Sequence, residues 1–252
     1  MSTDEVFVNP TVKQVVFQIK FPSLFYIEAK IGEYQMDIMK SFPKSEVVVR
    51  RQFILADVTK GQVLDEMPES GARKIWKFTS DSGIVLELQA DSLTLSSEHY
   101  SSYASGVLEE QFREVIHFAV GTFLDVTRVP ILDRIGLRYV DHCPIKSTSN
   151  MSFSRLYASC LPIRRFPLHE VTDAAVGVVV TLDKGYGLTY KEQYVPGDHK
   201  LILDIDAYYG PLSNPTEYLS IADELHVITS REFWLTAKEP LKGYMRSAKG
   251  GA

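Results

Sequence analysis

Two segments of this chain, 120 residues apart, constrain its fold most, because each alternates like a half-buried β-strand and each begins a similar series of elements. Residues 12–21 read VKQVVFQIKF, and residues 130–142 read PILDRIGLRYVDH. In both segments apolar side chains recur at every second position, with mainly polar ones between them. Placing Pro10 over Pro130 aligns the two strands without a gap. The apolar Val15, Phe17 and Ile19 then fall on Ile135, Leu137 and Tyr139, and the polar Gln14 and Gln18 fall on Arg134 and Arg138. This match predicts that the chain contains two related units.

The elements after the first strand follow a recognisable order. Residues 26–43 have apolar side chains at spacings of three and four up to Pro43, which predicts an amphipathic helix. Four strands rich in β-branched and aromatic residues come next, and a helix with one apolar stripe ends the first half. The predicted ranges are 45–57, 72–81, 84–91 and 93–100 for the strands and 106–126 for the helix.

The second half repeats this order less cleanly. A short helix is predicted at 152–161, with apolar residues on one face that ends at Cys160. A final helix begins near Asn214, which can cap it, and the basic tail 238–249 is expected to be frayed. Three strands are predicted between these helices, at 174–183, 187–195 and 199–209, with the DKGYGL stretch as a hairpin turn.

This order predicts an α+β fold made of a duplicated β-α-β4-α unit, residues 1–128 and 129–252, packed as one globular body. Such a unit resembles the TATA-box-binding-protein-like fold, in which helices cover one face of a largely antiparallel sheet and the other face stays open. The alternative is a helix-grip arrangement, in which a curved sheet wraps around a long helix.

Polar side chains gather on the side of these strands that faces away from the predicted core. A glycine within a strand often marks a close approach, and Gly136 lies among them. One interpretation is a solvated face with cross-strand Arg–Asp pairs. The other is a concave surface that binds a protein partner or an anionic ligand. The candidate binding residues are Arg134, Arg138, His142, Asp204, Asp206, Gln14 and Gln18.

Catalytic and metal-binding motifs are missing from the sequence. There is no H-E-x-x-H, C-x-x-C, G-x-S-x-G, P-loop or G-x-G-x-x-G pattern, so no metal and no cofactor is expected. Cys143 is expected to be a small core residue, since its neighbour His142 points to the opposite face of the strand. An enzyme acting on a small molecule or nucleotide remains the alternative, with His142, His169 and Glu170 as acid–base groups.

Charge and hydropathy narrow the partners further. The net charge of −5 disfavours duplex nucleic acid as a partner, because proteins that bind it gain affinity by releasing the counterions of its phosphates. The dipeptides Arg50–Arg51 and Arg164–Arg165 are local basic sites in this acidic chain. No apolar run reaches the length of a membrane span, and the first residues, MSTDEVFVNP, have no signal-peptide core. With only two cysteines, we expect a cytoplasmic protein; a homo-oligomer stays open.

The run RIGLRYVD (134–141) resembles the core motif of a sporadically distributed prokaryotic family of chains of similar length with no established function. Three further pieces agree, NPTVKQVVFQIKF, IWKFTSDSGIVLELQADSLTLSSEHYSSY and ADELHVITSREFWLTA, so the resemblance spans nearly the whole chain. It implies a prokaryotic cytoplasmic protein and supplies no catalytic residues. The family's patchy inheritance implies a role in defence or toxin neutralisation, an association without a physical basis. Sequence reasoning therefore favours a non-enzymatic binding or interaction protein.

Overall fold

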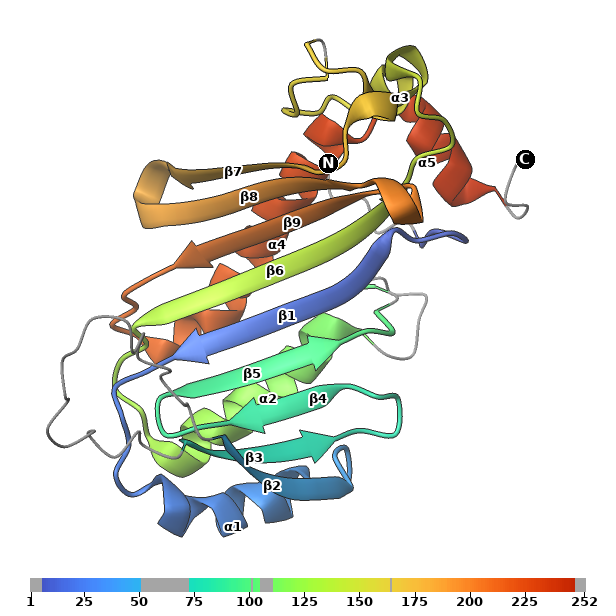
Figure 1. Ribbon diagram of the computed structural model, residues 1–252. Helices are drawn as coiled ribbons and strands as arrows, with labels where there is room; N and C mark the ends of the chain where they lie inside the picture. Colours follow the sequence, from blue (N-terminus) through green and yellow to red (C-terminus); the bar gives the residue numbers. More distant parts are fainter. Residues whose placement is uncertain (1–5, 51–72, 101, 105–110, 164, 248–252) are drawn as a thin grey trace, which may run out of the picture.

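The chain was analysed as a computed structural model that describes residues 6–50, 73–100, 102–104, 111–163 and 165–247 (Figure 1). Its strands are β1 (Val12–Lys20), β2 (Lys44–Arg50), β3 (Arg73–Thr79), β4 (Val85–Leu88), β5 (Ser92–Ser97), β6 (Arg134–Pro144), β7 (Ala174–Thr181), β8 (Tyr186–Val195) and β9 (Lys200–Tyr209). Its helices are α1 (Ile27–Ile38), α2 (Phe112–Thr127), α3 (Asn150–Leu156), α4 (Tyr218–Thr236) and α5 (Glu239–Arg246).

The strands form one antiparallel sheet in the order β2-β3-β4-β5-β1-β6-β9-β8-β7, so the predicted α+β class with a largely antiparallel sheet is confirmed. Helices α1, α2 and α4 cover one face of it. Alternate strand residues such as Val15, Phe17 and Ile19 point into the layer between sheet and helices and are fully buried. No helix in the described parts of the chain is long and apolar enough to cross a bilayer.

The sheet is symmetric about the pair of strands β1 and β6. Phe17 pairs with Leu137, the residue 120 positions later. Residues that the sequence alignment matches therefore lie equally far from the Phe17–Leu137 pair, on opposite sides of it. Strands β5, β4 and β3 follow on one side, and β9, β8 and β7 on the other. Strand β2 has no counterpart among the described residues of the second half. The duplicated β-α-β4-α unit and the TATA-box-binding-protein likeness therefore stay predictions.

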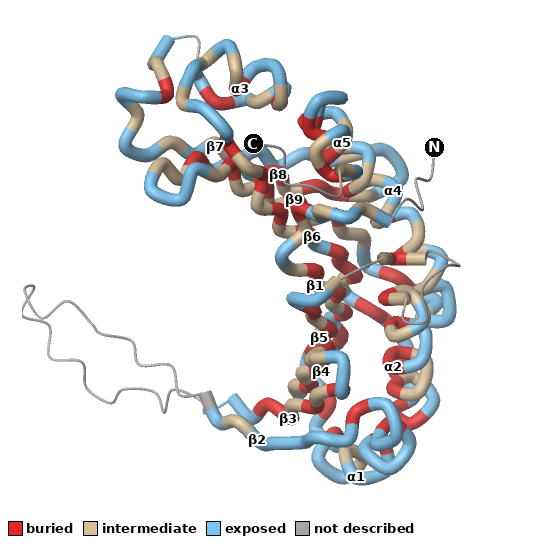
Figure 2. Tube along the Cα trace, turned by 90° about the vertical axis from the view of Figure 1, so that its right-hand side faces the viewer, coloured by how far each residue is buried: buried red, intermediate tan, exposed pale blue. Residues whose placement is uncertain are grey.

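The sheet is strongly bent, and both of its ends curve away from the helices (Figure 2). The face opposite α1, α2 and α4 is consequently concave. Strand twist of constant hand accumulates across a wide sheet and produces such curvature. We call this side the concave face. It contains the side chains that the sequence predicted to point away from the core.

Some predicted boundaries need correction. Helix α3 ends at Leu156, and Cys160 is exposed beyond it rather than on an apolar helix face. Asn214 caps a 3₁₀ turn, Pro215–Glu217, which leads directly into α4. The predicted strand residues 51–57 and helix residues 106–110 lie outside the described residues. The DKGYGL stretch forms the β7–β8 hairpin turn, as predicted.

The expectation of a frayed basic tail was wrong for residues 239–246, which form helix α5. Leu241 and Met245 are buried. The backbone N–H of Asn9 donates a hydrogen bond to the Met245 carbonyl at 2.9 Å, which ties the N-terminal segment to this helix. The charged residues of the tail concealed two apolar positions four residues apart, the spacing of one helix face.

Truncation of Leu241 to alanine should therefore cost about 2–4 kcal/mol of unfolding free energy, because it leaves a cavity in a packed contact. Leu235→Ala is the matched control, since Leu235 lies on α4 but is 64% exposed. Urea unfolding followed by circular dichroism measures both. Equal stability of the two variants would mean that α5 is not packed as described.

Candidate functional site

The concave face brings most of the predicted binding residues together on β1, β6 and β9, the strands at the middle of the sheet. Gln18 pairs with Gly136 across β1 and β6, and Arg138 pairs with Asp206 across β6 and β9. Gln14 lies opposite Val140, two rows along β6 from the pair of Gln18 and Gly136. Six of the seven candidates thus occupy neighbouring rows of one surface. They are Gln14, Gln18, Arg134, Arg138, Asp204 and Asp206.

Both arginines are held by aspartates of the adjacent strand. Arg138 donates through Nε and Nη2 to the two carboxylate oxygens of Asp204, at 2.6 and 2.9 Å. Arg134 Nη2 contacts both carboxylate oxygens of Asp206, at 3.0 and 2.8 Å. Such two-point contacts fix the guanidinium in direction as well as position. The Arg–Asp pairs expected from the sequence are therefore present.

Gly136 is explained by the arginine that precedes it by two positions. A Cβ atom at Gly136 would lie 2.3 Å from Arg134 Nη1, so the guanidinium lies directly across this glycine. Gly187 on β8 is related in the same way to the ring of Tyr208, 2.3 Å from its Cβ position. Arg134 in turn stacks on Tyr208, with 4.9 Å between the guanidinium carbon and the ring centre. The two glycines allow a flat arginine–tyrosine layer to lie against the sheet.

The first half of the chain has a neutral version of this arrangement. Gln18, the residue aligned with Arg138, donates from Nε2 to Thr94 Oγ1 at 3.0 Å. Thr94 is the β5 partner of Gln18, as Asp206 is the β9 partner of Arg138. The first half of the chain therefore has an amide–hydroxyl pair where the second half has an ion pair, so the two halves of the concave face differ in chemistry.

Ion pairs between arginine and aspartate dominate the electrostatics around these candidate residues. The hydrogen bonds that Arg138 donates to Asp204 raise the pKa of Arg138, which stays charged. Burial raises the pKa of Asp206 even though Arg134 opposes that shift. Because the strongest donors of both arginines are occupied by carboxylates, these two side chains offer little free positive charge. This weakens the anionic-ligand interpretation and the nucleic-acid alternative.

The three acid–base candidates of the enzyme alternative are not brought together. His142 lies on the concave face, and burial and nearby lysines lower its pKa. His169 and Glu170 form an exposed pair 3.5 Å apart in a short 3₁₀ turn and line none of the cavities described here. Within the described residues, no three His, Cys, Asp or Glu side chains are placed to hold a metal ion. Arg51 and Arg164 lie outside the described residues.

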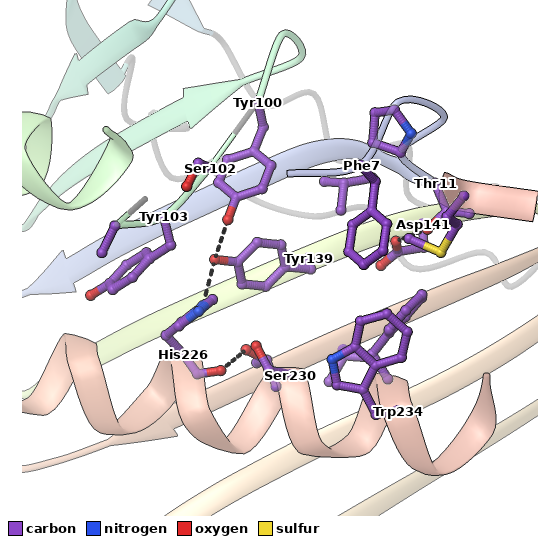
Figure 3. A pocket seen from close by; sticks show the side chains of 17 residues that line it. Phe7, Thr11, Tyr100, Ser102, Tyr103, Tyr139, Asp141, His226, Ser230 and Trp234 are labelled. Carbon is purple, nitrogen blue, oxygen red and sulfur yellow. Dashed lines mark hydrogen bonds between the residues drawn. The ribbon is translucent and has the colours of Figure 1, made fainter. Parts of the chain in front are cut away.

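Sequence reasoning missed a pocket on the opposite side of β6, between the sheet, α4 and the N-terminal segment (Figure 3). Tyr139, predicted only as a core residue, donates or accepts a hydrogen bond with Tyr100 at 3.4 Å and with His226 Nδ1 at 3.0 Å. Tyr103 stacks on His226 with 4.1 Å between ring centres. Phe7 and Trp234 lie nearer the other end, with ring centres 5.7 Å apart.

Asp141 is the unusual residue of this pocket, because it is a carboxylate in the core-facing positions of β6 and is only 2% exposed. Thr11 Oγ1 donates to Asp141 Oδ1 at 2.7 Å. Burial raises the pKa of Asp141 to about 7, and the hydrogen bond from Thr11 only partly opposes this. An acidic residue in phase with Ile135, Leu137 and Tyr139 was a visible signal, which the alternation argument did not use.

Neither a known protein family nor a curated protein matches this sequence.

If Gly136 exists to accommodate Arg134, Gly136→Ala should cost about 1 kcal/mol by displacing the guanidinium from Asp206. The cost should vanish in an Arg134→Ala background, where nothing overlies the glycine. Gly177→Ala on β7 is the control, because its Cβ would only touch Lys191 Cγ at 3.7 Å. Urea unfolding of the double-mutant cycle measures the coupling, and an unchanged cost in the Arg134→Ala background would contradict the explanation.

The raised pKa of Asp141 predicts a stability that depends on pH. Folding raises this pKa from 3.8 to about 7, so the folded state holds the proton more tightly and its stability falls as the pH rises through this window. Asp141→Asn cannot ionise and retains an oxygen that accepts from Thr11. Its gain in unfolding free energy over the natural protein should be larger at pH 8 than at pH 5, by on the order of 2 kcal/mol. Urea unfolding at the two pH values measures this, and a gain independent of pH would refute it.

Proposed function

We propose that this protein is a non-enzymatic binding protein that holds a polypeptide partner on its concave face. The observation that carries the proposal is the curved sheet face left uncovered by α1, α2 and α4, with polar side chains from adjacent strands directed into it. Its two arginines are neutralised by aspartates, so these side chains offer oriented polar groups rather than free charge. Such a surface suits a protein better than a phosphate-rich ligand.

The edge of this face also favours a protein partner. Strand β7 ends the sheet, reads AAVGVVVT and contains no charged residue. Val179 is 71% exposed, and it lies in the same row across the sheet as Arg138, Asp206 and Thr189. Natural edge strands usually carry charges or proline that block pairing with another strand. An unprotected apolar edge beside the concave face matches docking by an extended segment of a partner.

A cytoplasmic location belongs to the same proposal. Cys143 is buried and Cys160 is exposed, and both are free thiols. Unpaired cysteines are typical of a reducing compartment. The enzyme alternative has no comparable support, because His169 and Glu170 are exposed away from the described cavities.

The test is affinity purification from a lysate of the encoding organism with tagged natural protein and with Val179→Lys. The added charge should abolish recovery of proteins held at the β7 edge, without disturbing a fold in which this side chain is largely exposed. Val227→Lys is the matched control, since Val227 is also exposed but lies on α4, behind the sheet. The expected result is a set of proteins, identified by mass spectrometry, that are lost with Val179→Lys and retained with Val227→Lys.

Arg138→Ala is a second variant on the same face and should weaken the same partners. Circular dichroism and urea unfolding establish that each variant is folded. Identical recovery with the natural protein, Val179→Lys and Arg138→Ala would refute the proposal.

A further inference from the structure

The pocket on the helix side of β6 has a volume of about 110 Å³ and is separate from the concave face. Its aromatic side chains come from four parts of the chain: Phe7 from the N-terminal segment, Tyr100 from the loop after β5, Tyr139 from β6 and Trp234 from α4. Their rings meet at steep angles, such as 77° between Tyr100 and Tyr139 and 51° between Phe7 and Trp234. These are the contact geometries that aromatic rings prefer, and the rings of both pairs line the pocket.

One carboxylate lies at an end of this space. Figure 3 shows Asp141 beside Thr11, next to the rings of Phe7 and Trp234. Thr11 Oγ1 is the one hydrogen-bond partner of Asp141 among the described residues, and it contacts Oδ1. Oδ2 has no hydrogen-bond partner among the described residues. Because every fully buried side-chain polar atom in those residues has a partner, Oδ2 is open to the pocket.

Glu192 is a buried acid that, unlike Asp141, has several hydrogen-bond donors. It is fully buried and accepts hydrogen bonds from Ser159 Oγ, from Tyr190 Oη at 2.6 Å and from the Cys160 backbone N–H at 3.0 Å. Asp141, nearly as buried, has one such donor. A carboxylate that is nearly buried with a single donor is unfavourable in its charged form unless a positive charge or further donors accompany it.

Aromatic faces and a carboxylate attract the same kind of group. The ring quadrupole draws a cation to the π face, and cages of several rings are the known way in which proteins bind quaternary ammonium groups. An anionic ligand would be repelled by Asp141, and an apolar ligand would leave the charge of Asp141 uncompensated. We propose that this pocket binds a small organic cation with a quaternary ammonium group.

The size and the surrounding charges fit such a ligand. An apolar cavity of roughly 150 Å³ admits benzene, so about 110 Å³ suits a trimethylammonium head better than a larger ring system. One fixed cation beside the pocket is Lys242, whose Nζ lies 4.9 Å from the centre of the Trp234 ring. Glu239 is 2.8 Å from this ammonium and offsets its charge. The ring of Trp234 thus already attracts one cation.

The test is an isothermal titration calorimetry experiment, in which the full-length protein is titrated with choline at pH 8, where Asp141 is ionised. The neutral isostere 3,3-dimethylbutan-1-ol has the same shape without the charge. Choline is expected to bind saturably and at least about tenfold more tightly than the isostere, a difference of about 1.4 kcal/mol. A second titration, with a short peptide that contains trimethyllysine, distinguishes a free metabolite from a modified protein as the source of the group.

Two variants locate the binding site. Asp141→Asn should lower choline affinity about tenfold and leave the isostere unaffected, since it removes the charge and keeps the shape. Trp234→Leu should weaken choline binding without touching the buried carboxylate, so the test does not depend on the folding of one variant. Asp125→Asn, at an exposed position on α2, is the control and should bind choline as the natural protein does.

Equal affinity for choline and its neutral isostere would overturn the proposal. So would the absence of saturable binding of choline and of the peptide up to about 10 mM, or unchanged choline affinity in both folded pocket variants. None of these outcomes bears on the partner proposed for the concave face, because that partner is tested through Val179 and Arg138 on the other side of the sheet.

Discussion

The pairing of β1 with β6 is the interaction on which the rest of this structure depends. These two strands join the halves of the chain into one sheet, with Phe17 opposite Leu137 at the centre. Both residues are fully buried beneath the helices. Because side chains alternate along a strand, this register simultaneously assigns every residue of β6 to one of two faces. A slip of one position would exchange the arginines with the core.

Strand β6 consequently builds two different surfaces from one stretch of sequence. Its even positions place Arg134, Gly136 and Arg138 on the concave face, and its odd positions place Tyr139 and Asp141 in the aromatic pocket. The backbone hydrogen bonds of the strand hold both sets rigidly. Sites built on strands in the middle of a wide sheet are positioned more accurately than sites on loops.

The acidic residues of the two surfaces are treated in opposite ways. On the concave face, Asp204 and Asp206 are matched by guanidinium groups that approach diagonally, and Gly136 leaves the space for that of Arg134. In the pocket, Asp141 has a single hydroxyl donor and a pKa raised by burial. A paired charge contributes order to a surface, whereas a charge without a counterion stores free energy that a suitable ligand can release. This difference separates a surface suited to a polypeptide from a pocket suited to a cation.

The sequence by itself determined the alternation of the strands, the amphipathic helices α1, α2 and α4, the antiparallel α+β class and the face on which the arginines lie. These follow from local periodicity, which the chain expresses without reference to distant residues. Only the tertiary structure decided which carboxylate each arginine contacts, because Asp204 and Asp206 are about 70 residues away and lie diagonally across a register that no local pattern specifies. It also decided that α5 packs and that Asp141 reaches a pocket. Those outcomes depend on the N-terminal segment and α4 meeting over β6, a contact between parts of the chain more than 200 residues apart.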